Sequence, residues 1–426
     1  MTPHTLTATE ALAAMKAGRL TPLDLAESCL ARAAEREPVV QAFAHLDPAQ
    51  VIAQARALPA QGNGALHGIP VAFKDIIDTS EMPTRYGSAI HASNQPRRDA
   101  SVVALTRAAQ GVVFGKAVTA EFANRRPGPT TNPHDPARTP GGSSSGSAAA
   151  VGAGIVPFAL GTQTSASVIR PASYCGVHGF KASWGEISYA GVQLTSASND
   201  TIGFYARSIA DLDLLRSVLT RTPSVGLSPG NVGGPRIGLC RTPFAEQAEG
   251  YVHAILDEAA TSCAKAGATV TDCVLPSAYA QLADAHRWVS SYEGARSLAY
   301  EATFHRDALS QDILQGRIRD GEACSAELYR SSARFAEACR IEADAILGDY
   351  DAVLCPAAAS EAPIGLSFTG NAIFSTMWTI LHGPNVSIPG ATGPNGMPVG
   401  IQLVGRRGSD RRLLEVAAWV ERAVFG

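Results

Sequence analysis

The sequence predicts an α/β fold, in which helices cover both faces of a large, mixed and mostly parallel twisted sheet within a single composite domain. Hydrophobic residues make up 46% of the 426 residues and charged residues only 17%, which provides a large core and leaves little for disordered tails. Short β-rich runs alternate with helical patterns along the chain. No linker is long enough to separate a second domain.

The first half of the chain shows this alternation most clearly. Residues 1–60 carry apolar residues at helical spacing and are expected to form N-terminal helices. In the following region, 62–205, the runs GIPVAFKDIID (68–78) and GVVFGKA (111–117) are typical of strands, and a helical segment lies between them. This order favours parallel strands joined by a crossover helix, and IVPFAL (155–160) is a further strand candidate.

The second half of the chain changes character twice. Residues 206–347 are rich in helical patterns and predict a helical covering layer, interrupted by the strand candidate RIGLC at 236–240. Strand signals return in 348–426, with DAVLCP at 351–356 and MPVGIQLVG at 397–405. This last segment is therefore expected to rejoin the central sheet.

The overall charge argues against two classes of partner. Lys and Arg total 35 against 38 Asp and Glu, and the net charge of -3 gives no attraction to nucleic acid or to an acidic membrane, so a small-molecule substrate is expected. The N-terminal stretch lacks a secretory signal, and no run approaches the ~18 apolar residues of a spanning helix, which predicts a cytoplasmic protein. Eight scattered cysteines without metal-ligand spacing predict buried thiols and no metal site.

The stretch PGGSSSGSAAAVGAG, Pro140–Gly154, has three interpretations. A flexible linker is disfavoured because alanines follow directly and predict that a loop enters a buried helix. A phosphate-binding loop is disfavoured because neither GxxxxGK[ST] nor GxGxxG is present. A catalytic interpretation needs a base, and Lys74, within the apolar run IPVAFKDII, could serve because burial lowers a lysine pKa. Taken alone, Lys74 is better explained as an ordinary strand-end residue that pairs with Asp75 or extends to water.

Three blocks of sequence, taken together, carry a resemblance to a known family. They are GIPVAFKDIIDT, PGGSSSGSAAAVGAGIVPFALGTQTSASVIRPASYCGVHGFKAS and GPNVSIPGATGPNGMPVGIQLVG, in that order. They resemble the hallmark blocks of the amidase signature family, and the wording of the central block is most similar to malonamidase-type members. The resemblance implies a large mixed sheet layered with helices, a Ser-Ser-Lys triad and no cofactor.

The resemblance assigns the triad residue by residue. Lys74 is the base, Ser143 the bridging serine and Ser167 the nucleophile that forms the acyl-enzyme. It also implies that the Gly142-Ser143 peptide is cis, which gives Gly142 a role in supporting the site. Ser145 and Thr162 are expected to orient the catalytic serines, although Ser145 could instead cap the helix that follows.

The predicted oxyanion hole departs from the family pattern. The resemblance assigns it to the backbone N–H groups of Thr164, Ser165 and Ala166 together with that of Ser167. Family members usually carry Gly-Gly or Ala-Gly directly before the nucleophile, whereas this chain has Ser165-Ala166. A Cβ at Ala166 restricts the backbone, so we expect an adjusted loop or a preference for a slim acyl group.

Arg170, three residues after the predicted nucleophile, has two interpretations. In malonamidase-like members the arginine at this position binds the carboxylate of the substrate, which suits the bidentate geometry of a guanidinium. The alternative is a structural ion pair beneath the loop. The sequence alone leaves both interpretations open.

The resemblance therefore implies an amidohydrolase. It would cleave the C–N bond of a small amide and release ammonia or an amine, and an arginine at position 170 favours an amide that carries a carboxylate. Two alternatives stay open: the glutamine-hydrolysing subunit of a tRNA-dependent amidotransferase, and a relative that has lost catalysis and retained binding. A homodimer is among the expected assemblies.

Overall fold

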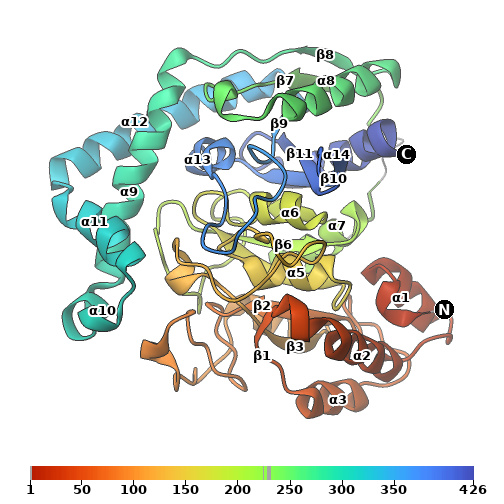
Figure 1. Cartoon of the computed structure of the whole chain (residues 1–426). Coiled ribbons are helices and arrows are strands. Elements are labelled where there is room, and N and C mark those ends of the chain that lie inside the picture. The colour runs from red at the N-terminus through yellow and green to blue at the C-terminus, as the bar shows by residue number, and fades with distance from the viewer. Residues whose placement is uncertain (1, 224, 228–231) are drawn as a thin grey trace.

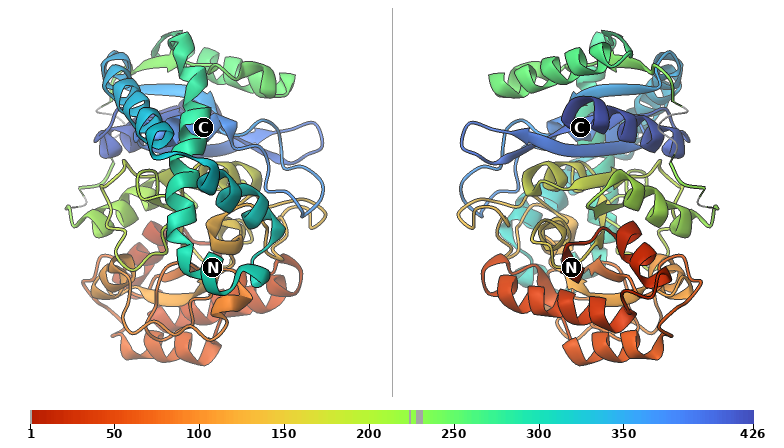
Figure 2. Two further views of the ribbon diagram at one scale, coloured as in Figure 1. Left: turned by 90° about the vertical axis from the view of Figure 1, so that its left-hand side faces the viewer. Right: turned by 90° about the vertical axis from the view of Figure 1, so that its right-hand side faces the viewer.

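One sheet of 11 strands organises the whole chain (Figure 1). The computed structural model describes residues 2–223, 225–227 and 232–426. The strand order is β1-β3-β2-β4-β6-β5-β10-β11-β9-β7-β8, and helices flank the sheet (Figure 2). The single-domain α/β fold with a large mixed sheet is thus confirmed.

The strands are short and come from every part of the chain. They are β1 (Phe43–His45), β2 (Pro70–Lys74), β3 (Val112–Ala117), β4 (Phe158–Gln163), β5 (His178–Lys181), β6 (Thr201–Ala206), β7 (Arg236–Leu239), β8 (Thr269–Asp272), β9 (Ala352–Pro356), β10 (Asn385–Thr392) and β11 (Pro398–Val404).

The α-helices lie before, between and after the strands along the chain, singly or in runs such as the helices within 282–348. They are α1 (Ala8–Lys16), α2 (Pro22–Val40), α3 (Pro48–Ala57), α4 (Ser101–Ala108), α5 (Ser145–Gly152), α6 (Ile169–Cys175), α7 (Ile209–Thr220), α8 (Gly250–Lys265), α9 (Leu282–Ser297), α10 (Ala299–Phe304), α11 (Arg319–Ala323), α12 (Ala326–Gly348), α13 (Ile373–Ile380) and α14 (Asp410–Phe425), with a π-helical turn at Ile313–Ile318. None of the described helices combines the length and apolar character needed to cross a membrane.

The expectation of a mostly parallel sheet is wrong. Within the described residues, four neighbouring pairs are parallel, β2–β3, β2–β4, β7–β8 and β7–β9, and six are antiparallel. The antiparallel pairs connect the two parallel groups through β6, β5, β10 and β11 at the centre. In the fully described segment between β5 and β6 there is no helix, and a short turn joins β10 to β11. Neither connection is the helical crossover that parallel strands need.

Residues 206–347 form more than a layer over the sheet. They supply strands β7 and β8 at one edge of it. Helices α7 and α8 of this region pack against the sheet, and its later helices build a helical arm, defined here as α9 to α12 with the π-helical turn, which stands beside the sheet at the left of Figure 1.

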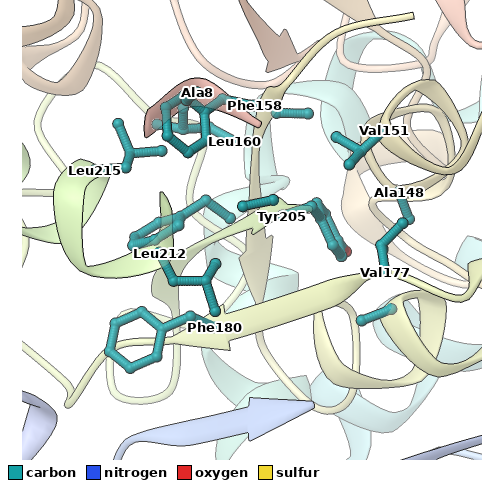
Figure 3. Close-up of a cluster of buried hydrophobic side chains, with 14 of the residues drawn as sticks. Ala8, Ala148, Val151, Phe158, Leu160, Val177, Phe180, Tyr205, Leu212 and Leu215 are labelled. Carbon is teal, nitrogen blue, oxygen red and sulfur yellow. The ribbon is translucent and has the colours of Figure 1, made fainter. Parts of the chain in front are cut away.

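The core lies on both sides of the strands that carry the predicted site. Figure 3 shows Leu212 and Leu215 of α7 on one side of β4 to β6, and Ala148 and Val151 of α5 on the other. Every residue of β2, β4 and β6 is buried, as the short apolar runs require. The site is therefore anchored on a rigid and fully buried part of the sheet.

Candidate active site

A buried lysine contacts two hydroxyl groups at the ends of two parallel strands. Lys74 closes β2, and its Nζ lies 2.7 Å from Ser143 Oγ and 2.9 Å from Thr162 Oγ1. Thr162 belongs to β4, which pairs with β2 in parallel, so the carboxyl ends of both strands meet here. Lys74 and Thr162 are separated by 88 positions in the sequence, and the sheet brings them together.

The environment of Lys74 suits a proton acceptor. Its side chain is fully buried, and burial lowers its pKa from 10.5 to about 7, although the nearby carboxylate of Asp200 acts in the opposite direction. A lysine with this pKa is substantially neutral at neutral pH and can take a proton from a hydroxyl. Lys74 neither pairs with Asp75 nor extends to water, because its recorded partners are the two hydroxyls.

The segment around Ser143 has the backbone that the resemblance implied. The Gly142-Ser143 peptide is cis, and Gly141 has a φ of +81°. A side chain at Gly141 would place its Cβ 2.9 Å from Pro171 Cα, so glycine is required there. Ser143 is 2% exposed and lies just before α5.

The Ser145 hydroxyl forms its hydrogen bond neither with a catalytic serine nor with the N-terminal N–H groups of α5. It is the first residue of α5, and its hydroxyl donates to the carbonyl oxygen of Val118 at 3.4 Å. The hydroxyl of Ser144, one residue earlier, donates to Thr162 O at 3.1 Å and accepts from Thr162 N at 3.2 Å. Ser144 therefore connects α5 to β4, a function that its place in the sequence did not indicate.

Ser167 is the most accessible of the three predicted catalytic residues. It lies between β4 and α6 and is 9% exposed, whereas Lys74 is 0% exposed and Ser143 is 2% exposed. Its carbonyl oxygen accepts from the hydroxyl of Tyr205 at 3.0 Å. A substrate reaching the site would therefore meet Ser167 before the residues behind it.

The loop before α6 presents unpaired N–H groups. Among the described residues, the backbone N–H groups of Ser165, Ala166 and Ser167 form no hydrogen bond. The carbonyl oxygen of Ala166 accepts from Arg170 N at 3.1 Å, as the first turn of α6 begins. Consecutive free N–H groups beside a hydroxyl are what an oxyanion hole requires.

Gln163 connects this loop to the helix that follows. Its Oε1 accepts from Val168 N at 2.9 Å and from Ile169 N at 3.1 Å, and its Nε2 donates to Thr379 Oγ1 at 2.9 Å. The side chain satisfies the first N–H groups of α6, which have no partner within the helix. It therefore fixes the turn in which Ser167 lies.

Arg170 contacts backbone oxygens rather than a carboxylate. It is 5% exposed, and its Nη1 donates to Gly370 O at 2.6 Å while its Nη2 donates to Gly142 O at 2.5 Å and to Thr369 Oγ1 at 3.1 Å. Burial lowers its pKa to about 10. The guanidinium connects the cis-peptide segment to the loop at 369–370. Among the described residues, no carboxylate forms the structural ion pair that was the alternative interpretation of Arg170.

A second arginine, which no sequence motif indicated, lies near the oxyanion loop. Arg317, in the π-helical turn, donates from Nε to Asn124 Oδ1 at 2.9 Å and from Nη1 to Ser290 Oγ at 2.7 Å. Burial lowers its pKa to about 10, and the carboxylate of Asp200 favours its charged form. Asp200 accepts a hydrogen bond from Thr164 Oγ1 at 2.6 Å. Because Asp200 contacts the oxyanion loop and also interacts with the Arg317 charge, Arg317 lies close to that loop.

Neither a metal site nor the cavity found elsewhere in the described structure involves the Lys74, Ser143 and Ser167 site. The described residues contain no group of three His, Cys, Asp or Glu side chains suited to a metal ion. A cavity of about 560 Å³, lined by residues including Trp184, Arg340 and His382, shares no residue with the site. The buried lysine with a lowered pKa and its two hydroxyl partners mark the candidate active site, and this cavity contains no such lysine.

Comparisons with known proteins agree with the fold and the motifs. The Amidase family matches residues 24–414. A relative from Chloroflexus aurantiacus, named as one of the subunits of glutamyl-tRNA(Gln) amidotransferase, is 35% identical over 470 aligned residues, which cover 98% of this chain and 96% of the relative.

Two solved structures extend the comparison to three dimensions. A crystal structure of an amidase matches with a TM-score of 0.89 at 30% identity, covering 98% of this chain and 99% of the other. The peptide amidase from Stenotrophomonas maltophilia matches with a TM-score of 0.84 at 28% identity, covering 98% and 96%. This chain belongs to the amidase signature family of enzymes that hydrolyse C–N bonds.

Proposed function

We propose that this enzyme hydrolyses the amide of a small molecule that carries a carboxylate, through an acyl-enzyme on Ser167, and releases ammonia. The contact of 2.7 Å between Lys74 Nζ and Ser143 Oγ, in a buried setting that lowers the lysine pKa to about 7, carries this proposal. A neutral amine on a serine hydroxyl is a base positioned for proton transfer.

Acylation uses all three residues. Ser167 Oγ attacks the carbonyl carbon of the amide and gives its proton to Ser143 Oγ, whose own proton passes to Lys74 Nζ. The free N–H groups of Ser165, Ala166 and Ser167 donate hydrogen bonds to the carbonyl oxygen and stabilise the negative charge that develops on it. The C–N bond then breaks, the proton returns through Ser143 to the leaving nitrogen, and ammonia departs.

Deacylation repeats the same relay with water. A water molecule attacks the ester carbon on Ser167, and its proton passes through Ser143 to Lys74. The tetrahedral intermediate collapses, the proton returns to Ser167 Oγ, and the carboxylic acid product leaves. Every proton transfer in both steps uses a group that this chain itself provides.

Arg317 is the better placed of two cations to bind a substrate carboxylate. The resemblance to malonamidase-type members assigns this function to Arg170, but the Arg170 guanidinium is directed at the backbone oxygens of Gly142 and Gly370. The Nη2 of Arg317 has no hydrogen-bond partner among the described residues. An arginine with a free N–H pair can bind a carboxylate without breaking existing bonds.

The curated relatives favour a second candidate function over a free-standing hydrolase. They carry the name of an amidotransferase component, so this chain could supply ammonia to a partner. Glutamine is itself a small amide with a carboxylate, and both candidates therefore share one chemistry. The alignment to the first relative extends over 470 positions and covers 98% of this chain and 96% of the relative, so the similarity itself does not separate the two candidates.

The decisive experiment assays the chain alone. Gel filtration would give its assembly state, monomer or homodimer, and ammonia release would be measured with glutamine, short dicarboxylic monoamides and their uncharged counterparts. Turnover of acidic amides by the purified chain supports the free-standing hydrolase. Activity that requires an added partner supports the amidotransferase component, and failure of a fluorophosphonate to label Ser167 would indicate a relative that has lost catalysis.

Matched variants complete the test. Arg317→Met is compared with Arg330→Met, an exposed arginine of α12, and Arg170→Met is assayed beside them. We expect Arg317→Met to raise KM for acidic amides and to leave KM for uncharged ones unchanged. If Arg170→Met alone shows this selectivity, the carboxylate binds where the malonamidase-like resemblance places it.

A further inference from the structure

The oxyanion loop of this chain has Ser165-Ala166 where its family usually has a glycine, and contacts from outside the loop surround this segment. Thr164 Oγ1 donates to Asp200 Oδ1 at 2.6 Å, and Ser165 Oγ lies 3.4 Å from His286 Nε2. We propose that His286, on α9 of the helical arm, is a positioning residue that holds the oxyanion hole in its active geometry. This inference rests on the proposed function of Ser167 as the nucleophile.

The principal contact of His286 is with the backbone. Its Nε2 lies 2.6 Å from the carbonyl oxygen of Thr164. A carbonyl oxygen can only accept, so Nε2 carries the proton and donates it. The ring is buried, and burial lowers its pKa from 6.5 to about 4, so the imidazole is neutral at pH 7 and has a single tautomer available for this bond.

A second hydrogen bond holds the next peptide. Thr379 Oγ1, on α13, donates to the carbonyl oxygen of Ser165 at 2.6 Å. In a planar trans peptide the carbonyl and the following N–H point in opposite directions. His286 at Thr164 O therefore sets the direction of the Ser165 N–H, and Thr379 at Ser165 O sets that of the Ala166 N–H.

These contacts explain how the loop functions without its glycines. Each of the two peptides that carry the free N–H groups of Ser165 and Ala166 is held by a hydrogen bond to its carbonyl oxygen. His286 binds the carbonyl oxygen of the first peptide and Thr379 that of the second. A loop held by side chains needs no backbone freedom at Ala166, because its conformation is fixed before substrate arrives. Preorganised donors are what stabilise the developing charge.

His286 also connects the oxyanion hole to the helical arm. Ser290, four residues later on the same face of α9, accepts from Arg317 Nη1 at 2.7 Å. One helix therefore carries both the group that holds the loop and the partner of the proposed carboxylate ligand. Displacement of α9 would change catalysis and substrate binding together.

The test compares a substitution that removes the donor with one that keeps it. His286→Leu loses the N–H donor, and His286→Gln retains one. Since a small misplacement of catalytic groups can cost about 100-fold, we expect His286→Leu to lower kcat by about 10- to 100-fold with little change in KM. His286→Gln should recover much of that loss.

The control is a histidine with the same kind of contact elsewhere. His253 Nε2 lies 2.9 Å from Ala245 O, and neither residue contacts the site, so His253→Leu should leave kcat unchanged. Thermal unfolding of all four proteins separates folding from catalysis. The rate of phosphonylation of Ser167 by a fluorophosphonate gives an independent readout of the oxyanion hole.

The outcomes distinguish this inference from the proposed function. If wild-type Ser167 is labelled and active while His286→Leu retains full kcat, or if His286→Gln is impaired as strongly as His286→Leu, the positioning role is wrong. If wild-type Ser167 is not labelled, the proposed nucleophile fails instead.

Discussion

Replacement of Lys74 by methionine should stabilise the protein while it abolishes catalysis. Methionine has a similar length and no charge, so it fits a buried site that disfavours an ammonium group. The pKa of Lys74 falls from 10.5 in a solvated chain to about 7 in the folded protein. At about 1.4 kcal/mol per pH unit, this difference corresponds to roughly 5 kcal/mol against the charged form.

The pH dependence of that effect follows from linkage. Between pH 7 and 10.5 the unfolded chain binds a proton on Lys74 that the folded protein does not, so wild-type stability falls as the pH is lowered through this window and rises as the pH is raised. The penalty is fully present below pH 7 and disappears above 10.5. The stability advantage of Lys74→Met should therefore shrink by about 1.4 kcal/mol for each pH unit that the pH rises in this window.

The assay measures the free energy of unfolding by urea denaturation at about pH 7.5, 8.5 and 9.5, where the slope applies. Loss of the bonds to Ser143 and Thr162 shifts the difference between variant and wild type by a constant, and leaves its slope unchanged. Lys16→Met, at an exposed lysine, serves as the control with a flat difference. A flat difference for Lys74→Met as well would show that Lys74 is charged in the folded protein, which would refute the proposed base.

Three further predictions concern catalysis. The acid limb of kcat/KM should have its midpoint near pH 7, because protonated Lys74 cannot accept a proton, and a midpoint near pH 4 would point to another base. Ser167→Ala should lose essentially all ammonia release with an unchanged unfolding temperature, whereas the exposed Ser331→Ala should remain active; comparable activity of the two would exclude Ser167 as nucleophile. Asp200→Ala should lower kcat by about tenfold, as expected when a charged hydrogen bond to Thr164 is lost, and unchanged kinetics would show that this contact does not hold the loop.

Much of the site was accessible from short motifs. Lys74, Ser143 and Ser167 stand in three segments whose apolar, Gly-rich and Ser-rich patterns are distinctive, and the resemblance added the cis peptide at Ser143. The pairing of Lys74 with Ser143 then follows from the position of β2 in the sheet.

The remaining groups could not be found in this way. Arg317 and His286 are single polar residues on helices without any motif, and only tertiary packing brings them to the oxyanion loop. Arg170 stands at the spacing expected of a carboxylate-binding residue, yet it contacts Gly142, 28 positions away, and Gly370, 200 positions away, and the sequence does not indicate either contact. The mostly parallel sheet was a wrong prediction because a short strand such as β5 has no sequence signal for its direction.

The most direct test of the central claim follows the phosphonylation of Ser167 as a function of pH. Mass spectrometry of the wild-type protein treated with a fluorophosphonate should place the adduct on Ser167, with a rate that rises through pH 7 as Lys74 loses its proton. Lys74→Met should show almost no labelling at any pH. An adduct on another serine, or equal labelling of Lys74→Met and wild type, would contradict activation of Ser167 by Lys74 through Ser143.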